Sequence, residues 1–161
     1  MRAAPLPALL AALLAVSLLA GCGPESEATW PGGIARFEGD GKPGVEQGDW
    51  LYRYPDGQPR EAGRYRSGRR IGVWTQWHRN GQRATEGERS WVEASGASER
   101  QGEWLTWHEN GTLRSRGRWV DGERQGPWEF WLEQGAVDEK RSGRYEDGRK
   151  IRTSEQGGEG Q

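Results

Sequence analysis

The residue types that most often carry chemistry are scarce in this sequence. It has two histidines, His78 and His108, and one cysteine, Cys22. Two histidines without a cysteine or a convergent carboxylate are a weak basis for a zinc site, which takes four ligands. Both histidines stand six residues after a glycine, at a position where Tyr54 stands in a third copy of the same pattern. This favours a structural ring over a metal ligand or general base, so we expect no metal site and no cofactor.

The acidic residues do not suggest catalysis either. Asp56, Asp121 and Asp147 each precede a glycine, which is typical of turns rather than of catalytic acids. No nucleophile elbow, P-loop, dinucleotide fingerprint or calcium-loop pattern occurs. The sequence therefore predicts a protein that is not an enzyme.

Two recurrent sets of side chains could bind a ligand without catalysis. One is a set of tryptophans on which a glycan or peptide could stack, and the other is a set of arginines that could bind anionic groups. The candidates are Trp77, Trp107, Trp131, Arg64, Arg66, Arg116, Arg118 and Arg144. In the structural alternative, arginines cover the tryptophan rings, solvate a sheet face and hinder edge pairing. For the tryptophans the sequence does not decide between ligand binding and a structural role, whereas for the arginines it favours the structural role.

These residues recur because the sequence is repetitive. The stretch from Gly102 to Gly126 combines two aromatic runs with the turn dipeptides Asn110-Gly111 and Asp121-Gly122. Similar stretches begin at glycines 48, 72, 102 and 126, in steps of 24, 30 and 24 residues. Self-similarity at such a period indicates a repeat architecture. We predict an all-β fold, an elongated antiparallel meander or solenoid of β-hairpin repeats.

Each repeat begins with a run in which aromatic residues alternate, as in a β-strand with one buried face. The first tryptophans of the four runs are Trp50, Trp74, Trp104 and Trp128. We expect them to form the core, because the repeats have few aliphatic residues to bury. The second tryptophans lie three residues further on, and odd spacing places them on the opposite face.

A glycine closes each hairpin, nine residues after the first glycine of the repeat. These are Gly57, Gly81, Gly111 and Gly135. Asp or Asn precedes three of them, and Gln134 precedes the fourth. Asn-Gly and Asp-Gly favour type I′ turns, in which both central residues have positive φ. We therefore predict type I′ turns here, with a looser turn at Gln134.

The return strand places a glycine and a ring on the same face. Gly63 precedes Tyr65 by two residues, and Gly117 precedes Trp119 by the same distance. Each of these glycines leaves a slot that a neighbouring ring could cover.

The repeated pattern resembles the variant MORN repeat of bacterial proteins. Its clear examples are GVWTQWHRNG, GEWLTWHENG, GRWVDG and GRYEDG, and the resemblance covers 48–151. It implies a sheet of MORN-like β-hairpins. Many such bacterial proteins are grouped in a YwqK-like antitoxin family, which would imply a partner toxin. The departures from the pattern are Gln134 and six extra residues in the second repeat.

The N-terminus resembles a lipoprotein signal peptide. Arg2 precedes an apolar run over 6–20, which is short for a transmembrane helix and indicates a signal helix that is later removed. The sequence Leu-Ala-Gly-Cys that ends at Cys22 resembles a lipobox, which implies cleavage before this cysteine and its lipidation. The alternative is an ordinary signal peptide with an incidental cysteine. Gly23 resembles outer-membrane rather than inner-membrane sorting in diderm bacteria.

The sequence therefore predicts five segments. They are a lipoprotein signal peptide at 1–21, a flexible tether at 22–29, a degenerate N-terminal cap at 30–47, four repeats at 48–151 and a disordered tail at 152–161. The repeats span 48–71, 72–101, 102–125 and 126–151. For the six extra residues, within 87–101, we expect a longer loop on one side of the sheet.

Charge excludes one class of partner, since 23 Lys and Arg residues against 24 Asp and Glu residues do not make a nucleic-acid-binding protein. Our leading hypothesis is an exported protein anchored to the bacterial cell envelope through Cys22. Its MORN-like sheet would bind or scaffold another protein. One alternative is a glycan- or anionic-lipid-binding module, and another is an antitoxin or immunity protein that neutralises a partner toxin.

Overall fold

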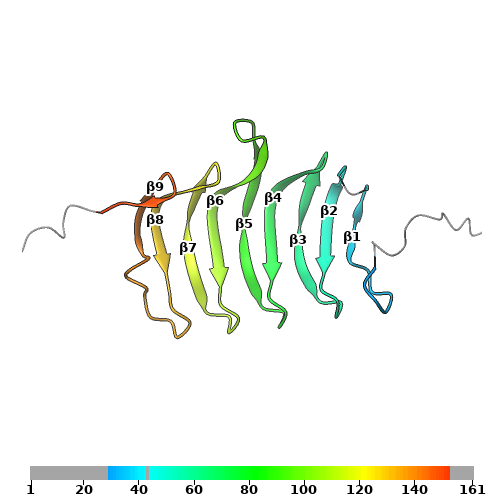
Figure 1. Ribbon diagram of the computed structural model, residues 1–161, viewed down its shortest axis with the longest axis horizontal. Coiled ribbons are helices and arrows are strands. Elements are labelled where there is room, and N and C mark those ends of the chain that lie inside the picture. Colours follow the sequence, from blue (N-terminus) through cyan, green and yellow to red (C-terminus); the bar gives the residue numbers. More distant parts are fainter. Residues whose placement is uncertain (1–28, 43, 153–161) are drawn as a thin grey trace, which may run out of the picture.

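The computed structural model describes residues 29–42 and 44–152. Its ten strands form one antiparallel sheet in which neighbours in the chain are neighbours in space (Figure 1). The strands are β1 (Phe37–Asp40), β2 (Gln47–Arg53), β3 (Pro59–Arg66), β4 (Arg69–Trp77), β5 (Arg83–Val92), β6 (Ala97–Trp107), β7 (Leu113–Val120), β8 (Glu123–Phe130), β9 (Gly143–Glu146) and β10 (Arg149–Lys150). The described part of the chain contains no helix, so the predicted all-β meander is confirmed. The predicted signal helix, Cys22 and the tail beyond residue 152 lie outside the described residues.

A row of alternating tryptophan and glycine crosses the sheet. Each first tryptophan is paired with the glycine of its own return strand, as in Trp104 opposite Gly117. Its ring folds over the glycine of the preceding strand, so that Trp104 covers Gly87 and Trp128 covers Gly117. A Cβ on either glycine would come within 3.0 Å of the ring. The slots predicted beside the return-strand aromatics are therefore filled by neighbouring rings.

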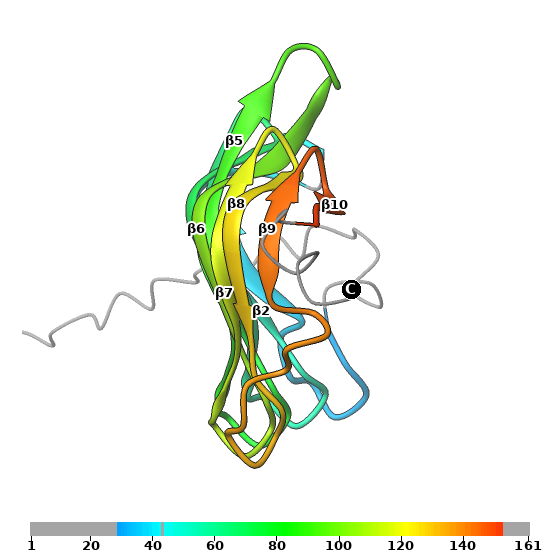
Figure 2. The ribbon, with the colours of Figure 1, turned by 90° about the vertical axis from the view of Figure 1, so that its left-hand side faces the viewer.

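The core is a single layer of side chains on the face that carries this row, which we call the aromatic face. Its buried hydrophobic members are Trp50, Tyr65, Trp74, Trp104, Trp128, Phe130 and Tyr145. Several rings meet edge to face, as Tyr65 and Trp74 do at a centroid distance of 5.0 Å and an angle of 87°. Such pairs contribute about 0.5–1.5 kcal/mol beyond burial. Within the described residues no second layer covers this sheet, and Figure 2 shows it edge-on as one curved layer.

Strand β1 lies at the N-terminal end of the sheet, within the region 30–47. Phe37 stands opposite Tyr52 in β2 and stacks on Trp50 at a centroid distance of 5.3 Å. Trp50 in turn covers Gly39. This end strand thus repeats the tryptophan-over-glycine contact of the complete repeats.

The turns at Gly57, Gly81, Gly111 and Gly135 differ from the prediction in type. Only the glycine has positive φ, 86° at Gly57 and 89° at Gly135. The N–H of Gly57 donates to the carbonyl of Tyr54, whose own N–H donates to the carbonyl of Gln58. These bonds define a type I turn with a glycine bulge, so the predicted type I′ turns are wrong here. Gln134 needs no positive φ in this geometry, and its turn closes with the same two bonds, each 2.8 Å, rather than the predicted looser turn.

Type I′ geometry occurs at the opposite ends of the strands. Ser67 and Gly68 have φ of 50° and 73°, and Asp121 and Gly122 have φ of 47° and 81°. These two-residue loops join one repeat to the next. A loop of this length requires both central residues to have positive φ if it is to follow the strand twist.

The six extra residues of the second repeat lengthen two strands. Strands β5 and β6 have 10 and 11 residues and remain paired out to Val92 opposite Ala97. Figure 1 shows this hairpin extending beyond its neighbours. The guanidinium of Arg69 lies 3.7 Å from the ring centroid of Trp91 on the extension. The predicted longer loop is therefore only partly correct: four residues, 93–96, join β5 to β6 where two residues join the strands of the other repeats, and the remaining added residues continue the ladder.

Candidate binding faces

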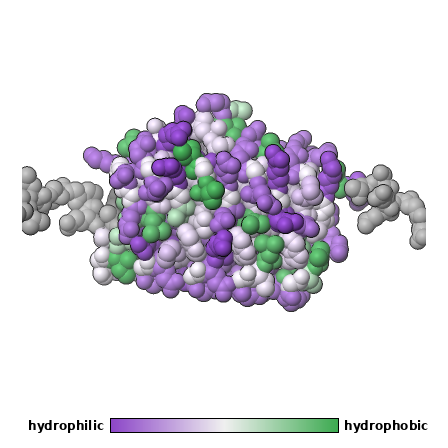
Figure 3. Space-filling model, turned by 180° about the vertical axis from the view of Figure 1, so that it is seen from behind, coloured by the Kyte–Doolittle hydropathy of each residue, from purple (hydrophilic) through white to green (hydrophobic). Residues whose placement is uncertain are grey.

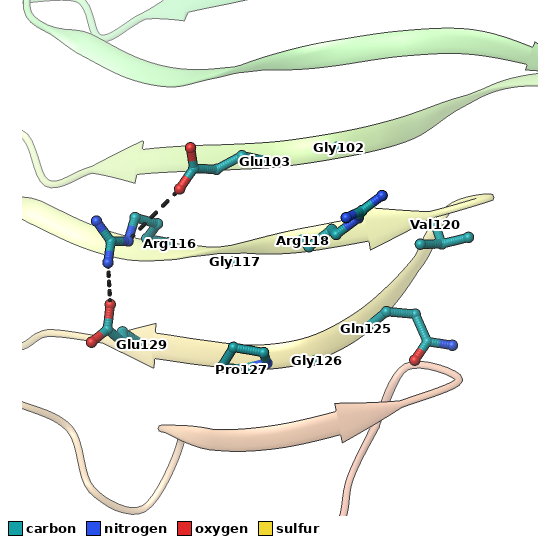
Figure 4. A pocket seen from close by; sticks show the side chains of 10 residues that line it. All are labelled: Gly102, Glu103, Arg116, Gly117, Arg118, Val120, Gln125, Gly126, Pro127 and Glu129. Atoms are coloured by element: carbon teal, nitrogen blue, oxygen red, sulfur yellow. Dashed lines mark hydrogen bonds and ion pairs between the residues drawn. The ribbon is translucent and has the colours of Figure 1, made fainter.

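The predicted arginine strip lies on the face opposite the core, which we call the polar face. Arg64, Arg66, Arg116, Arg118 and Arg144 are all exposed. Carboxylates accompany three of them: Arg64 lies 3.4 Å from Asp49 and Arg144 lies 3.7 Å from Glu146. Arg116 lies between Glu103 and Glu129 at 3.8 and 3.0 Å (Figure 4). Positive and negative charges thus alternate on this face, and exposed pairs of this kind contribute little stability.

A hollow of about 890 Å³ lies on the polar face over β6, β7 and β8. Figure 4 shows Arg116 and Arg118 on β7, with Val120 at the end of the same strand and Pro127 on the adjacent β8. A second hollow, of about 550 Å³, lies over β1 to β4 and includes Arg64. Figure 3, which views one face of the molecule, shows small hydrophobic patches scattered among hydrophilic residues. The residues that line the two hollows include both ion pairs and apolar side chains.

The second tryptophans, Trp77, Trp107 and Trp131, are half-buried. The guanidinium of Arg83 lies 5.3 Å from the centroid of the Trp107 ring and also pairs with Glu86 at 3.1 Å. A cation–π contact of the expected kind therefore covers part of this ring. No described residue stacks a ring on it in an aromatic pair.

The two histidines connect successive repeats through the second tryptophans. Nε2 of His78 lies 3.0 Å from the carbonyl oxygen of Trp107, and Nε2 of His108 lies 2.9 Å from that of Trp131. The hydroxyl of Tyr54 donates to the carbonyl of Trp77 in the same way, at 2.8 Å. Because a carbonyl only accepts, each histidine must carry a proton on Nε2. The described residues hold no group of three or more His, Cys, Asp or Glu side chains that could bind a metal ion.

A row of four half-buried arginines on the aromatic face was not predicted. It consists of Arg70, Arg89, Arg100 and Arg124, which we call the arginine row. Three of them stand two residues before the first glycine of a repeat, so an Arg-x-Gly-x-Trp motif could have revealed them. Arg89 occupies the position that Tyr65 and Trp119 hold in other repeats. In the strand pairing, each of these three positions stands opposite an arginine of the next strand. Tyr65 is opposite Arg70, Arg89 is opposite Arg100 and Trp119 is opposite Arg124.

One end of the row is neutralised by a buried acid. Glu61, which is 7% exposed, binds Arg70 through two hydrogen bonds of 2.6 and 3.1 Å and accepts a third from Gln76 at 3.0 Å. Burial alone would lower the pKa of the Arg70 guanidinium, but Glu61 and Tyr65 outweigh it and the pKa is raised. Burial also raises the pKa of Tyr52, whose hydroxyl bonds to that of Tyr65 at 3.1 Å. Charge is therefore compensated at Arg70.

The rest of the row is only partly compensated. Burial and the charge of Arg70 lower the pKa of Arg89, and the opposing charges of Glu61 and Glu99 do not outweigh them. Burial and the charges of Arg89 and Arg124 likewise lower the pKa of Arg100. Among the residues that the structure describes, none offers Arg89, Arg100 or Arg124 a carboxylate within 4.0 Å. The central part of the aromatic face is therefore positively charged.

This geometry can be compared with known families. Residues 100–121 match the MORN repeat variant. The matched segment begins in β6, contains the whole of β7 and includes Trp104 and Gly117. MORN repeats are generally non-enzymatic binding modules, so the match indicates a repeat-based binding or scaffolding role. A search of curated proteins finds no match to the chain.

The matched MORN repeat has the same strand register as its neighbours. Trp74 stands opposite Gly87 and Trp128 opposite Gly143, as Trp104 stands opposite Gly117. The described residues include no helix that is both long and apolar enough to cross a bilayer.

Proposed function

We propose that the chain is an exported protein of the bacterial cell envelope, anchored by lipid on Cys22, whose MORN-type sheet binds another protein. The match at residues 100–121 supports a binding role, and the Leu-Ala-Gly-Cys sequence that ends at Cys22 supports the anchor. One observation carries the proposal. The described strands form a single layer, so each face of the sheet is open to a partner.

We assign the partner to the hollow on the polar face over β6, β7 and β8. The hollow combines arginine side chains with apolar ones, and Val120 remains 38% exposed. Arginine is enriched in the centres of protein interfaces, where its planar group stacks and forms several hydrogen bonds. Arg118 lies beside the paired Arg116 and is the arginine we expect to contact the partner.

Replacing Arg118 by glutamate is expected to lower partner capture at least tenfold, because it reverses a charge inside the hollow. Capture is measured by chemical cross-linking and affinity purification from envelope extracts. Arg114→Glu is the matched control, since Arg114 is an exposed arginine of the same strand outside the lining of the hollow. Equal capture by the wild type and both variants would show that the hollow is not the site. No specific capture by the wild type would contradict the binding function itself.

Replacing Cys22 by serine is expected to abolish lipid attachment, because a serine hydroxyl cannot form the thioether to which lipobox processing leads. Attachment is measured as incorporation of an alkyne-bearing palmitate into the full chain in growing cells. Lipid label on Cys22→Ser equal to that on the wild type would rule out the anchor. In a diderm host, Gly23→Asp provides a second measurement, since it is expected to move the labelled protein towards the inner membrane.

A further inference from the structure

The arginine row crosses the centre of the aromatic face. Its members lie on β4, β5, β6 and β8. Neighbouring strands are about 4.8 Å apart, so four strand spacings give the row a length of about 19 Å. Arg70 at one end is paired with Glu61, whereas the other three guanidiniums lie among rings.

Arg89 and Arg100 stand directly opposite each other on adjacent strands. Like charges in this arrangement destabilise a sheet. The repeat pattern does not require the pair, because the other repeats place a ring opposite the arginine, as Trp119 stands opposite Arg124. The second repeat has therefore exchanged a ring for a second cation at the middle of the face. Such an exchange lowers the stability of the free protein and raises its attraction for an anion.

The guanidiniums of the row retain unused hydrogen-bond donors. Arg100 lies 4.8 Å from the centroids of both Trp104 and Trp119, and none of the described residues accepts a hydrogen bond from its side chain. Nε of Arg124 is buried and has no hydrogen-bond partner in the part of the chain that the structure describes. Arg89 donates to the carbonyl of Ser98 at 2.9 Å through one of its amino groups. A guanidinium that stacks on a ring still has N–H groups along its edge, and two of these can bind one carboxylate.

We propose that the arginine row binds an acidic polypeptide segment, an extended run of Glu or Asp residues in a partner protein. The three arginines without an ion-pair partner among the described residues, Arg89, Arg100 and Arg124, span three strand spacings, or about 14 Å, which four to five residues of extended chain cover. Carboxylates at alternate positions would meet the guanidiniums of Arg89, Arg100 and Arg124. The guanidiniums are recessed among aromatic rings, which suits a narrow chain better than a flat lipid surface. This site lies on the face opposite the hollow assigned above, so evidence for or against one site does not bear on the other.

The probe is a fluorescein-labelled peptide of six glutamates, and the protein is the full chain in non-ionic detergent. Fluorescence anisotropy is expected to show binding that weakens as salt rises, since the contacts are between charges. The double variant Arg89→Gln/Arg100→Gln is expected to weaken binding at least tenfold. The matched control Arg114→Gln/Arg149→Gln removes two exposed arginines that lie outside the row, and its affinity should stay within twofold of the wild type.

Thermal melting separates binding from a structural role. Arg89→Gln/Arg100→Gln is expected to melt close to the wild-type temperature, because removing the repulsion between the two cations offsets the loss of the Ser98 hydrogen bond and of the contacts with Trp104 and Trp119. A lower melting temperature with unchanged peptide affinity would show that the row is structural and would overturn the proposal. So would equal affinity in the wild type and the double variant.

Two further measurements distinguish other occupants. Binding of the wild type to phosphatidylglycerol vesicles but not to the glutamate peptide would overturn the proposal in favour of a lipid headgroup. The variant in which Glu25, Glu27, Glu155 and Glu159 are replaced by glutamine tests the chain's own acidic residues. If only this variant binds the peptide, one of those segments occupies the row in place of a partner, and the proposal is wrong.

Discussion

Replacing Gly117 by alanine is expected to destabilise the protein by about 3 kcal/mol, the upper part of the usual range for an overpacked core. A Cβ at this position would lie 2.6 Å from Cγ of Trp128 and nearer still to two other atoms of that ring. The ring is 3% exposed and packs against Phe130 and Tyr145, so it has little room to move aside. The free energy of unfolding from a urea titration measures the loss.

A double-mutant cycle with Trp128→Leu identifies the cause. A smaller, flexible side chain leaves room for a Cβ, so Gly117→Ala is expected to cost less than 1 kcal/mol in the Trp128→Leu background. If the cost is the same in both backgrounds, the glycine is required for a reason other than the covering ring. Gly117 does not have positive φ, which removes the usual conformational reason for glycine.

The fold could be predicted from the sequence because its determinants are local. Each repeat has a tryptophan equivalent to Trp104 and a glycine equivalent to Gly117. Alternation along a strand fixes the face on which they lie. The turn types could not be predicted in the same way. Asn110-Gly111 suits several hairpin turns, and the choice depends on how many residues lie outside the ladder. A loop of two residues forms a type I′ turn at Asp121-Gly122, whereas a loop of three residues forms a type I turn with a glycine bulge at Gly111.

The arginines show why the candidate sites were only partly predictable. Arg116 and Arg118 stand in a visible alternation and face solvent as expected. Arg100 and Arg124 stand just before the first glycine of a repeat, where the sequence suggests a boundary rather than part of a face. Arginine is also rarely buried, so composition alone places it at the surface. Their half-burial depends on the register of neighbouring strands, which brings Trp119 of β7 beside both guanidiniums. Trp104 and Trp128 of their own strands also lie beside them.

The buried carboxylate was equally hard to predict, because Glu61 lies in a return strand whose other charges face solvent. Replacing Glu61 by leucine is expected to destabilise the protein by about 2–3 kcal/mol. Removing one member of a buried ion pair typically costs 3–5 kcal/mol, and the partial exposure of Arg70, whose side chain is 29% accessible, reduces this value. The variant also leaves the amide of Gln76 without the acceptor that it has at 3.0 Å. Urea unfolding measures the change.

The double variant Glu61→Leu/Arg70→Leu tests whether the unpaired charge is the cause. Apolar replacement of both members of a buried pair is often neutral, so most of the lost free energy should return. If the double variant is as unstable as Glu61→Leu alone, the loss comes from packing rather than from an uncompensated guanidinium. Recovery would mean that Glu61 is retained to hold Arg70 and Gln76 in place rather than to add stability. Arg70, which has a carboxylate partner, differs in this respect from Arg100, which pairs with no carboxylate of the described residues.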